Sequence, residues 1–442
     1  MDSISYYKNK NVGILGLGVS GLEAAKVLIK SHANIFVFDD KKNISSAPLK
    51  TKWLHYQSWS WNEIDTLVVT PGIPINHSNQ HEAIKLAKKN KTKIVNDIDL
   101  FFQTKPRAKV IGITGTNGKS TTVALLNHIL SFNHINSVIG GNFGTPACGI
   151  KDPGKKGVII LELSSYQLDG ASKLLLNAAS IINLTPDHLN YHETFDLYKE
   201  SKLKILNFLI KDGNFIINKN NNFIENTLNI KNQNKIKILE VNPNNSKNFI
   251  KKNIFLEGKH NYINTAIAIA FAKILSLNNK QIELAIKTFK GLPHRLEPIY
   301  SSKKIKIVND SKATNGESSS AALKSFKNIF WIAGGEAKSD GMGAALSCLE
   351  NVLKIFLIGK SSNLFYEQIS TVNKDIPIIK CATLDRAIVL AIDKAKKSEL
   401  GHIVILLSPA AASFDQYINF EERGDKFKSL VKTHYPKKSL AC

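Results

Sequence analysis

A glycine-rich segment in the first third of the chain has the residue types and spacing of a phosphate-binding loop. It comprises Gly115, Thr116, Asn117, Gly118, Lys119, Ser120 and Thr121, between an apolar run at 110–113 and a helical pattern at 123–130. In such loops consecutive backbone N–H groups surround phosphates, the lysine reaches the β and γ oxygens, and the next hydroxyl can coordinate Mg²⁺. The usual motif has glycine five positions before Gly118, where this chain has Ile113. The segment predicts binding of a nucleoside triphosphate, and an ordinary glycine turn is the weaker alternative.

Acidic and imidazole groups follow two further apolar runs. Glu162 comes at the expected carboxyl end of a strand downstream of the loop, a position that suits Mg²⁺ bridging to ATP. His188 follows Asp187 at the end of another run. A lone histidine at a strand end is more often a surface hydrogen-bonding group, and the lysines of segment 199–204 by themselves indicate a solvated helix face. On residue types alone, Glu162 therefore joins the hydroxyl of Ser120 as a candidate ligand for a nucleotide-bound metal, whereas His188 and the lysines do not stand out.

A second glycine motif lies near the beginning of the chain. Residues 16–21 read Gly-Leu-Gly-Val-Ser-Gly, after an apolar run at 12–15 and before a helical pattern at 22–30. Backbone N–H groups at such a helix start can approach a diphosphate. Asp39 ends the next apolar run, where an acid would meet a ribose hydroxyl. NAD, a nucleotide sugar and a turn without ligand all remain open for this motif.

Polar turns also mark the last third of the chain. Arg295, one of only four arginines, lies beside an expected domain boundary, from which it could enter a neighbouring phosphate site. Three later apolar runs are followed by the polar segments 309–315, 334–339 and 408–413. Ligands of open α/β sheets bind at the carboxyl ends of the strands, so these segments predict a second ligand site.

Apolar runs and helical patterns alternate along the whole chain, which predicts an α/β fold with largely parallel sheets. Expected strands fall at 12–15, 35–38, 67–70, 110–113, 157–161, 179–183, 305–308, 329–333, 354–358 and 403–407. A chain of 442 residues exceeds one core, because domains usually have about 100–200 residues. We predict a Rossmann-like N-terminal domain (1–97), a central P-loop ATPase-like domain (98–294) and a Rossmann-like C-terminal domain (295–442).

The composition is that of a folded protein, with 43% apolar and 21% charged residues. A net charge of +23 suggests nucleic acid first, but only four of the 59 basic residues are arginine and the lysines are scattered. We therefore expect acidic small molecules as partners and no nucleic acid. No apolar run could span a bilayer, no secretory leader is visible, and the four cysteines lack disulfide or metal spacing. These features indicate a cytoplasmic protein without membrane insertion.

Seven segments, taken together and in order, resemble the Mur ligases, the ATP-dependent amino-acid ligases of peptidoglycan precursor synthesis. They are GITGTNGKST (112–121), GGNFGTPA (140–147), ELSSYQL (162–168), GKHNYINTAIA (258–268), LPHRLE (292–297), NDSKATN (309–315) and LSPAAASFDQYINFEERGDKF (407–427). The resemblance extends from Gly13 to about Leu430 and is greatest to the members that add D-glutamate to UDP-N-acetylmuramoyl-L-alanine. It implies an enzyme that converts a carboxylate to an acyl phosphate with ATP, which an incoming amine then attacks.

The resemblance also implies a nucleotide and metal site. The loop 115–121 and Lys119 would bind the ATP phosphates, and Ser120 and Glu162 would hold one Mg²⁺. A second Mg²⁺ would be held by His188 and by a carbamylated lysine, which matches Lys202. Arg295 would act on the transferring phosphoryl group. The residues that would complete the nucleotide site from the domain interfaces are Asn261, Asn264, Arg295 and Asp310.

For the two other substrates the resemblance implies separate sites. The UDP group would bind Val19, Ser20, Asp39, Asp40, Lys41, Thr70 and Gly72, and the muramoyl-alanine part would bind Asn142 and His188. D-Glutamate would bind Lys312, Thr314, Lys338, Ser413 and Phe420, with its α-carboxylate at Thr314 and Lys338 and its side-chain carboxylate at Ser413 and the backbone of Phe420. Asp40 and Lys41 depart from the threonine and arginine common in relatives. A monomer is expected.

Three competing interpretations are less consistent with the sequence. Ligases of this family that add a diamino acid carry an Asn-Pro-Arg signature, which this chain lacks. Folylpolyglutamate synthetases share the phosphate loop but lack the first glycine motif and the long 407–427 segment. A non-catalytic nucleotide- or nucleic-acid-binding protein would leave Glu162, His188, Arg295 and Lys338 unexplained.

Overall fold

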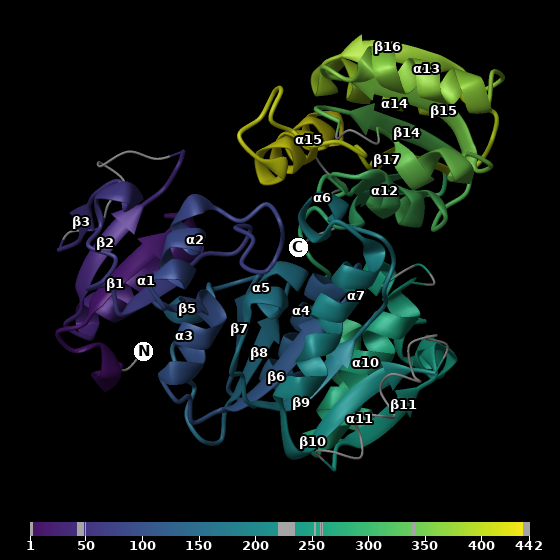
Figure 1. Ribbon diagram of the computed structural model, residues 1–442. Helices are drawn as coiled ribbons and strands as arrows, with labels where there is room; N and C mark the ends of the chain where they lie inside the picture. Colours follow the sequence, from purple (N-terminus) through teal and green to yellow (C-terminus); the bar gives the residue numbers. More distant parts are fainter. Residues whose placement is uncertain are drawn as a thin grey trace. The chain divides into compact units, whose positions relative to one another are not determined.

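Three β-sheets, each flanked by helices, carry the chain in the computed structural model (Figure 1). The structure describes residues 3–41, 48, 50–219, 235–251, 253–256, 258, 260–337 and 341–435. Among these residues all strand pairs are parallel except one at an edge of the third sheet. The predicted α/β class with largely parallel sheets is therefore confirmed.

The first sheet has five strands. In spatial order they are β3 (Lys52–Trp53), β2 (Asn34–Phe38), β1 (Asn11–Leu15), β4 (Thr66–Val69) and β5 (Lys93–Asn96). Its helices are α1 (Val19–Lys30) and α2 (Glu82–Lys89). Gly16 has φ +93°, and a Cβ there would collide with Thr70 Oγ1, so only glycine allows the tight turn from β1 into α1. The first glycine motif consequently lies at the carboxyl ends of β1 and β4.

The second sheet has six parallel strands, with the phosphate loop at its centre. In spatial order they are β11 (Lys237–Val241), β10 (Leu209–Asn218), β9 (Leu176–Ile181), β6 (Lys109–Thr114), β8 (Val158–Glu162) and β7 (Ser137–Gly141). Its helices include α4 (Lys119–Phe132), α5 (Ser165–Gly170), α6 (Leu189–His192) and α7 (Phe195–Leu203). Because β6 pairs with both β8 and β9, the segments that follow these three strands emerge side by side.

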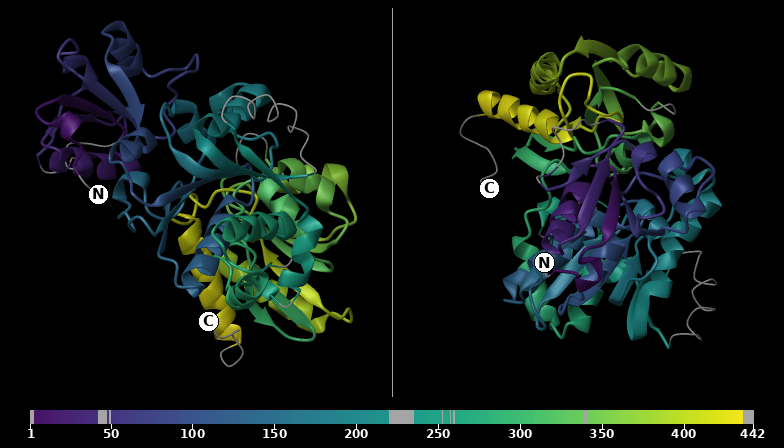
Figure 2. Two further views of the ribbon diagram at one scale, coloured as in Figure 1. Left: turned by 90° about the horizontal axis from the view of Figure 1, so that it is seen from below. Right: turned by 60° about the vertical axis from the view of Figure 1, so that its left-hand side comes forward.

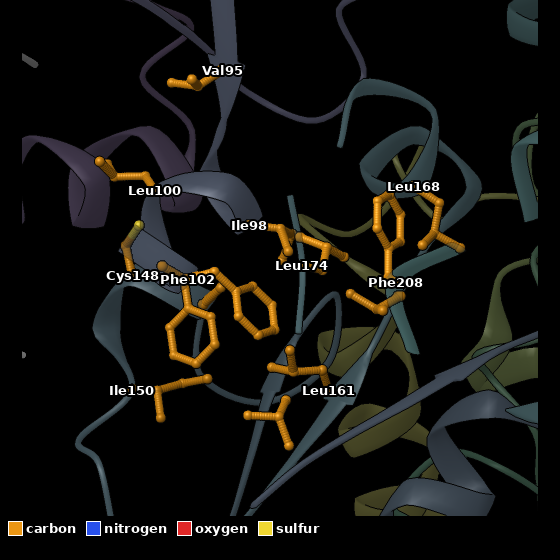
Figure 3. Close-up of a cluster of buried hydrophobic side chains, with 14 of the residues drawn as sticks. Val95, Ile98, Leu100, Phe102, Cys148, Ile150, Leu161, Leu168, Leu174 and Phe208 are labelled. Atoms are coloured by element: carbon orange, nitrogen blue, oxygen red, sulfur yellow. The ribbon is translucent and has the colours of Figure 1, made fainter. Parts of the chain in front are cut away.

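A continuous apolar core joins the first two sheets (Figure 3). Its seam is formed by α3 (Asp97–Gln103) and the 3₁₀ helix η4 (Ala147–Gly149), which supply Phe102 and Cys148. The Cys148 thiol is buried and donates to the Asp97 carbonyl over 3.3 Å. Burial, with the charges of Asp97 and Glu23, raises the pKa of this thiol well above its usual value.

The third sheet also has six strands. In spatial order they are β12 (Glu297–Ser301), β13 (Ile305–Asn309), β17 (Ile403–Leu407), β14 (Ile329–Gly334), β15 (Val352–Ile358) and β16 (Ile378–Ala382). The helices are α12 (Gly316–Leu323), α13 (Ser362–Val372), α14 (Leu384–Lys397) and α15 (Phe420–His434). The antiparallel edge strand β12 contains Pro298, which sheets tolerate at edges. Helix α15, yellow in Figure 2, packs against α14 and β13.

The chain divides into two compact units that are not consecutive in sequence. One comprises 1–248 and 263–286 and holds the first two sheets; the other comprises 249–262 and 287–442 and holds the third sheet. Three further helices lie near the positions where the chain passes from one unit to the other: α9 (Lys247–Ile250), α10 (His260–Ile274) and α11 (Asn279–Thr288). The three-domain boundaries at 97 and 294 stay a prediction. In the described part of the chain no helix is long and apolar enough to cross a membrane.

Candidate active site

The phosphate loop is fixed by asparagine side chains. Gly118 is left-handed, with φ +86°, and a Cβ there would meet Asn264 Oδ1, so glycine is required both by backbone angle and by space. The N–H groups of Thr116 and Asn117 both donate to Asn183 Oδ1, over 3.1 and 2.9 Å. The loop then opens α4, and N–H groups at such a helix N-terminus suit an anion.

Two lysines meet at one carbonyl oxygen of this loop. Lys119 Nζ donates to the carbonyls of Gly115 and Thr116, each over 2.8 Å. Lys202 Nζ donates to the same Gly115 oxygen over 3.0 Å and to Thr114 Oγ1 over 3.3 Å. The two amines therefore lie close together at one oxygen of the loop.

Lys202 is almost completely removed from water, with 1% of its surface exposed. Burial, and then the charge of Lys119, lowers the pKa of Lys202 well below its usual value, although Asp187 and Glu162 oppose the shift. The interpretation of this segment as a solvated helix face is therefore wrong for Lys202. It suits Lys199, whose side chain is 31% exposed and pairs with Asp196 over 3.2 Å.

Glu162 offers a buried carboxylate beside the loop. It ends β8, where it pairs in register with Ile113 of β6. Its Oε1 accepts from Asn142 Nδ2 over 2.8 Å, whereas Oε2 is buried without a hydrogen-bond partner in the described part of the structure. An unsatisfied buried carboxylate oxygen is costly and is a ligand that a hard cation prefers.

The same edge of the sheet presents Ser120, the second residue of α4, which is buried. Within the described ranges, no three His, Cys, Asp or Glu side chains gather as a metal centre. A cation here would depend on Glu162, the serine hydroxyl and oxygens of the nucleotide.

His188 is connected to the loop through the segment after β9. Thr116 Oγ1 donates to the Thr185 carbonyl over 3.0 Å and contacts Tyr198 Oη at 2.8 Å. His188 Nδ1 lies 2.8 Å from Tyr166 Oη. Burial raises the pKa of Tyr166 to about 12, so its hydroxyl keeps its proton and can donate to Nδ1. The other ring nitrogen, Nε2, lies 3.4 Å from Asp187 Oδ2.

The first glycine motif is organised by Asp39. Its two carboxylate oxygens accept from the N–H groups of Leu17 (2.6 Å) and Lys41 (2.9 Å), so this acid orders the turn itself. In contrast to Gly16, a Cβ on Gly18 or Gly72 would meet nothing within 4 Å. Open space at these two glycines is where a diphosphate could approach the backbone.

The remaining residues expected around this motif lie close to it. Thr70 Oγ1 donates to the Leu15 carbonyl over 3.1 Å, and Asp40 Oδ1 lies 3.3 Å from His81 Nε2. Val19 is 69% exposed at the start of α1, and Ser20 hydrogen-bonds to the buried Asp97.

A second group of polar side chains gathers at the carboxyl edge of the third sheet. Asp310 accepts from the Leu296 N–H over 3.1 Å and from Ser408 Oγ over 2.8 Å. Its burial raises its pKa to about 7, although these two hydrogen bonds and Arg295 lower it. Lys312 Nζ lies 5.2 Å from the centre of the Phe420 ring.

The structure thus brings most of the expected residues into three groups. The first unit holds the residues around the first glycine motif and a second group with the phosphate loop, Asn142, Glu162, His188, Lys202 and Asn264. The second unit holds Asp310, Lys312, Thr314, Ser413 and Phe420. Asn261 is buried on α10 in the second unit. Lys338 lies outside the described residues. Sequence reasoning missed Asn183 and Tyr166, although a polar residue directly after an apolar strand was a usable signal for Asn183.

The chain was compared with known families and proteins. Residues 113–287 match the Mur ligase middle domain, and residues 294–410 match the Mur ligase glutamate ligase domain. A curated relative from Rickettsia bellii, named UDP-N-acetylmuramoylalanine--D-glutamate ligase, is 34% identical over 455 residues, covering 97% of this chain and 99% of its own. The chain belongs to the Mur ligase family.

Other relatives of this Mur ligase agree with that assignment. The protein of the same name from Agrobacterium fabrum is 33% identical over 98% of this chain and 97% of its own. Among solved structures, UDP-N-acetylmuramate-alanine ligase MurC from Thermotoga maritima has a TM-score of 0.56 at 15% identity, covering 96% of this chain and 99% of that one. MurF from Acinetobacter baumannii has a TM-score of 0.56 at 16% identity, covering 97% and 92%. These two structures show the common fold alone.

Proposed function

We infer that this Mur ligase adds D-glutamate to UDP-N-acetylmuramoyl-L-alanine at the expense of ATP, a step of peptidoglycan precursor synthesis. The observation that carries the inference is the match to relatives named for that reaction, which extends over 97% of this chain. The phosphate loop with its paired lysines supports the use of ATP. The named substrates are all small acidic molecules, which suits the charge of +23.

We propose that the reaction proceeds in two steps. The terminal carboxylate of the UDP substrate attacks the γ-phosphorus, which gives an acyl phosphate and ADP. The amine of D-glutamate then attacks the acyl carbon, the tetrahedral intermediate expels phosphate, and the amine loses a proton. Lys119 and the loop N–H groups hold the ATP phosphates, and Arg295 stabilises the charge on the transferring group. To do so, Lys119 exchanges its contacts with the Gly115 and Thr116 carbonyls for phosphate oxygens.

Magnesium fits the residues beside the loop. The unsatisfied Oε2 of Glu162 and the hydroxyl of Ser120 would hold one ion. When bound, Mg²⁺ neutralises negative charge on the phosphoryl oxygens. Asn142 supports the site by its hydrogen bond to Glu162 Oε1, which directs the other oxygen away from it.

We propose that Lys202 is carbamylated and that, with His188, it would hold a second Mg²⁺. A carbamate forms when a neutral amine adds to CO₂ and releases one proton, so the lowered pKa of Lys202 supports the assignment. The product is an anion, and the adjacent Lys119 would compensate its charge. The buried lysine without a carboxylate hydrogen-bond partner in the described structure thereby acquires a reason for its position.

The other binding roles are proposals of the same kind. The open glycine turn of the first sheet, with Asp40, Lys41 and the residues around Thr70, would hold the UDP group. The carboxyl edge of the third sheet would hold D-glutamate at Lys312, Thr314, Ser413 and Phe420, and Lys338 would add a cation. Asn261, Asn264 and Asp310 would complete the nucleotide site. We further propose a cytoplasmic monomer with three domains at 1–97, 98–294 and 295–442.

The reaction is tested by phosphate release from ATP. Release is expected only when UDP-N-acetylmuramoyl-L-alanine and D-glutamate are both present. Equal release with L-alanine or meso-diaminopimelate in place of D-glutamate would refute the acceptor assignment. Release without any acceptor would identify a plain ATPase.

The carbamate is tested with the variants Lys202→Ala and Lys199→Ala, which remove a buried and a half-exposed lysine from the same helix. We expect Lys202→Ala to lower turnover by about 10²-fold or more, because a group that stabilises transferring charge is lost, while ATP binding persists through Lys119. Added acetate or formate should restore part of this turnover. Lys199→Ala should behave as wild type. Near-normal turnover in Lys202→Ala would refute the assignment.

A further inference from the structure

Arg423, on the first turn of α15, is an arginine that the reaction scheme does not yet use. It is 1% exposed and ranks among the largest fully buried side chains of the described structure. All five guanidinium N–H groups have acceptors: Nε donates to Ser311 Oγ, Nη1 to the carbonyls of Gly334 and Ala412, and Nη2 to those of Ser311 and Ala411. None of these acceptors carries a formal charge.

These acceptors lie where ligands of such a sheet bind. Ser311 follows β13, Gly334 ends β14, and Ala411 and Ala412 follow β17. Strands β13, β17 and β14 are neighbours in the middle of the sheet, so one side chain connects the carboxyl ends of three adjacent strands. Arg423 thereby fixes the backbone directly before Ser413, by hydrogen bonds of 3.1 and 3.3 Å to Ala411 and Ala412.

The same arginine is coupled to Phe420, one helical turn earlier. Ser311 Oγ accepts from Arg423 Nε over 3.0 Å and donates to the Phe420 carbonyl over 2.8 Å. Both residues to which the side-chain carboxylate of D-glutamate is assigned, Ser413 and Phe420, are therefore held through Arg423. This step rests on the proposed function.

The charge of Arg423 is poorly compensated. Asp415 acts on it electrostatically, but this carboxylate accepts from the Lys360 N–H over 2.9 Å and makes no hydrogen bond to the guanidinium in the described structure. Desolvating a cation is costly unless an anion is close. An acceptor carboxylate bound at Ser413 would supply that anion in a region of low dielectric, where the interaction is strong.

We propose that Arg423 is a positioning residue that selects an acceptor with a side-chain carboxylate: it fixes the loop that carries Ser413 and supplies a buried positive charge beneath it. The residue does not touch the acceptor. Its effect is on the preference for D-glutamate over the neutral isostere D-glutamine, which has the same shape without the charge.

The test measures kcat/KM for D-glutamate and D-glutamine in wild type, Arg423→Met and Arg423→Lys, with the exposed Arg386→Met as a matched control. Arg423→Met, which keeps length and loses charge, should reduce the preference for D-glutamate by about 10–100-fold. Arg423→Lys keeps the charge but provides three donors in place of five, so it should raise the KM for D-glutamate by about tenfold while the preference persists. KM for ATP and for the UDP substrate should not change in either variant.

Several outcomes would overturn the proposal. One is a folded Arg423→Met that keeps the wild-type preference; another is an Arg423→Lys with the wild-type KM for D-glutamate. If Arg423→Met does not fold, the KM of Arg423→Lys decides alone. A wild-type enzyme that does not use D-glutamate refutes the proposed function itself, before any variant is compared.

Discussion

Replacing Lys202 with methionine should stabilise the ligand-free protein while abolishing its activity. Methionine has a similar length and no charge, so it can fill the buried site without a desolvation cost. The Gly115 carbonyl that accepts from Lys202 also accepts from Lys119 over 2.8 Å and is not left unsatisfied. The other acceptor, Thr114 Oγ1, is bonded only at 3.3 Å. The substitution therefore removes an unfavourable buried amine and loses little hydrogen bonding.

The expected gain follows from the cost of burying polar and charged groups. Exchanging a poorly compensated buried charge for an apolar side chain of similar volume stabilises proteins by about 1–3 kcal/mol. For a unit of this size that corresponds to a rise in melting temperature of roughly 3–10 °C. The gain also depends on pH. Because the folded-state pKa of Lys202 is depressed, the wild type loses stability as pH falls from the unfolded-state value of 10.5 through the folded-state value. The difference between variant and wild type should accordingly be larger at pH 6 than at pH 10.

Thermal unfolding in CO₂-depleted buffer measures the gain, with Lys202→Ala as the control for volume. Alanine leaves a cavity and should melt below methionine, since such truncations cost about 2–5 kcal/mol. Added bicarbonate should shift the melting temperature of the wild type and leave that of Lys202→Met unchanged. A lower melting temperature for Lys202→Met than for wild type would refute the reasoning, because it would mean that the amine is a net stabilising group.

Three further predictions concern other parts of the two units. Gly18→Ala should fold as wild type, because a Cβ there meets open space, and it should raise the KM for the UDP substrate. Gly16→Ala should instead be destabilised by about 1–3 kcal/mol, because Gly16 has φ +93° and a Cβ there collides with Thr70 Oγ1. Melting curves and KM values distinguish the two variants. Asp310→Asn should reduce the pH dependence of stability. Asp310 stabilises the wild type most below its unfolded-state pKa of 3.8, and this stabilisation is lost as pH rises to about 7, whereas asparagine does not titrate. The melting temperature should therefore fall less between pH 4 and pH 8 in the variant than in the wild type. Glu162→Gln keeps an acceptor for Asn142 but removes the charge, and it should raise the Mg²⁺ concentration for half-maximal turnover by about tenfold or more; an unchanged Mg²⁺ dependence would exclude Glu162 as a metal ligand.

The sequence predicted the mostly apolar strands well and missed most of those that contain charged residues or glycine, among them the longest strand, β10. The expected strand 403–407 coincides with β17, a fully buried run of aliphatic residues. The two-residue β3, and β7 with its two glycines, were not predicted, because neither has enough apolar length to stand out from its neighbours. Such strands are formed by pairing with an existing sheet, which is a tertiary effect.

The site was predictable where backbone geometry determines the residue type. Gly118 is required by a positive φ and by Asn264, and a loop motif expresses that requirement in the sequence. The burial of Lys202 was not predictable from spacing, because α7 and the following 3₁₀ helix η5 (Lys204–Phe208) together contain three lysines in a short stretch, and only packing against α5 decides which of them is covered. The family resemblance singled out Lys202 as the lysine proposed to be carbamylated. Its burial and its position beside Lys119 are the physical support for that proposal. The use of Arg423 as a connector of three strand ends depends on contacts across more than 100 residues, as between Arg423 and Ser311.

The buried cysteines allow the rate at which each unit opens to be measured by chemical labelling. All three cysteines in the described part of the chain are buried, with Cys148 in the first unit and Cys348 and Cys381 in the second. A thiol with a raised pKa that water cannot reach does not react with alkylating reagents until its surroundings open. Cys148 lies at the seam of α3 and η4, so its labelling rate counts openings between the first two sheets (Figure 3). Mass spectrometry of the labelled peptides would then give a separate opening rate for each of the two units in one sample, without any introduced probe.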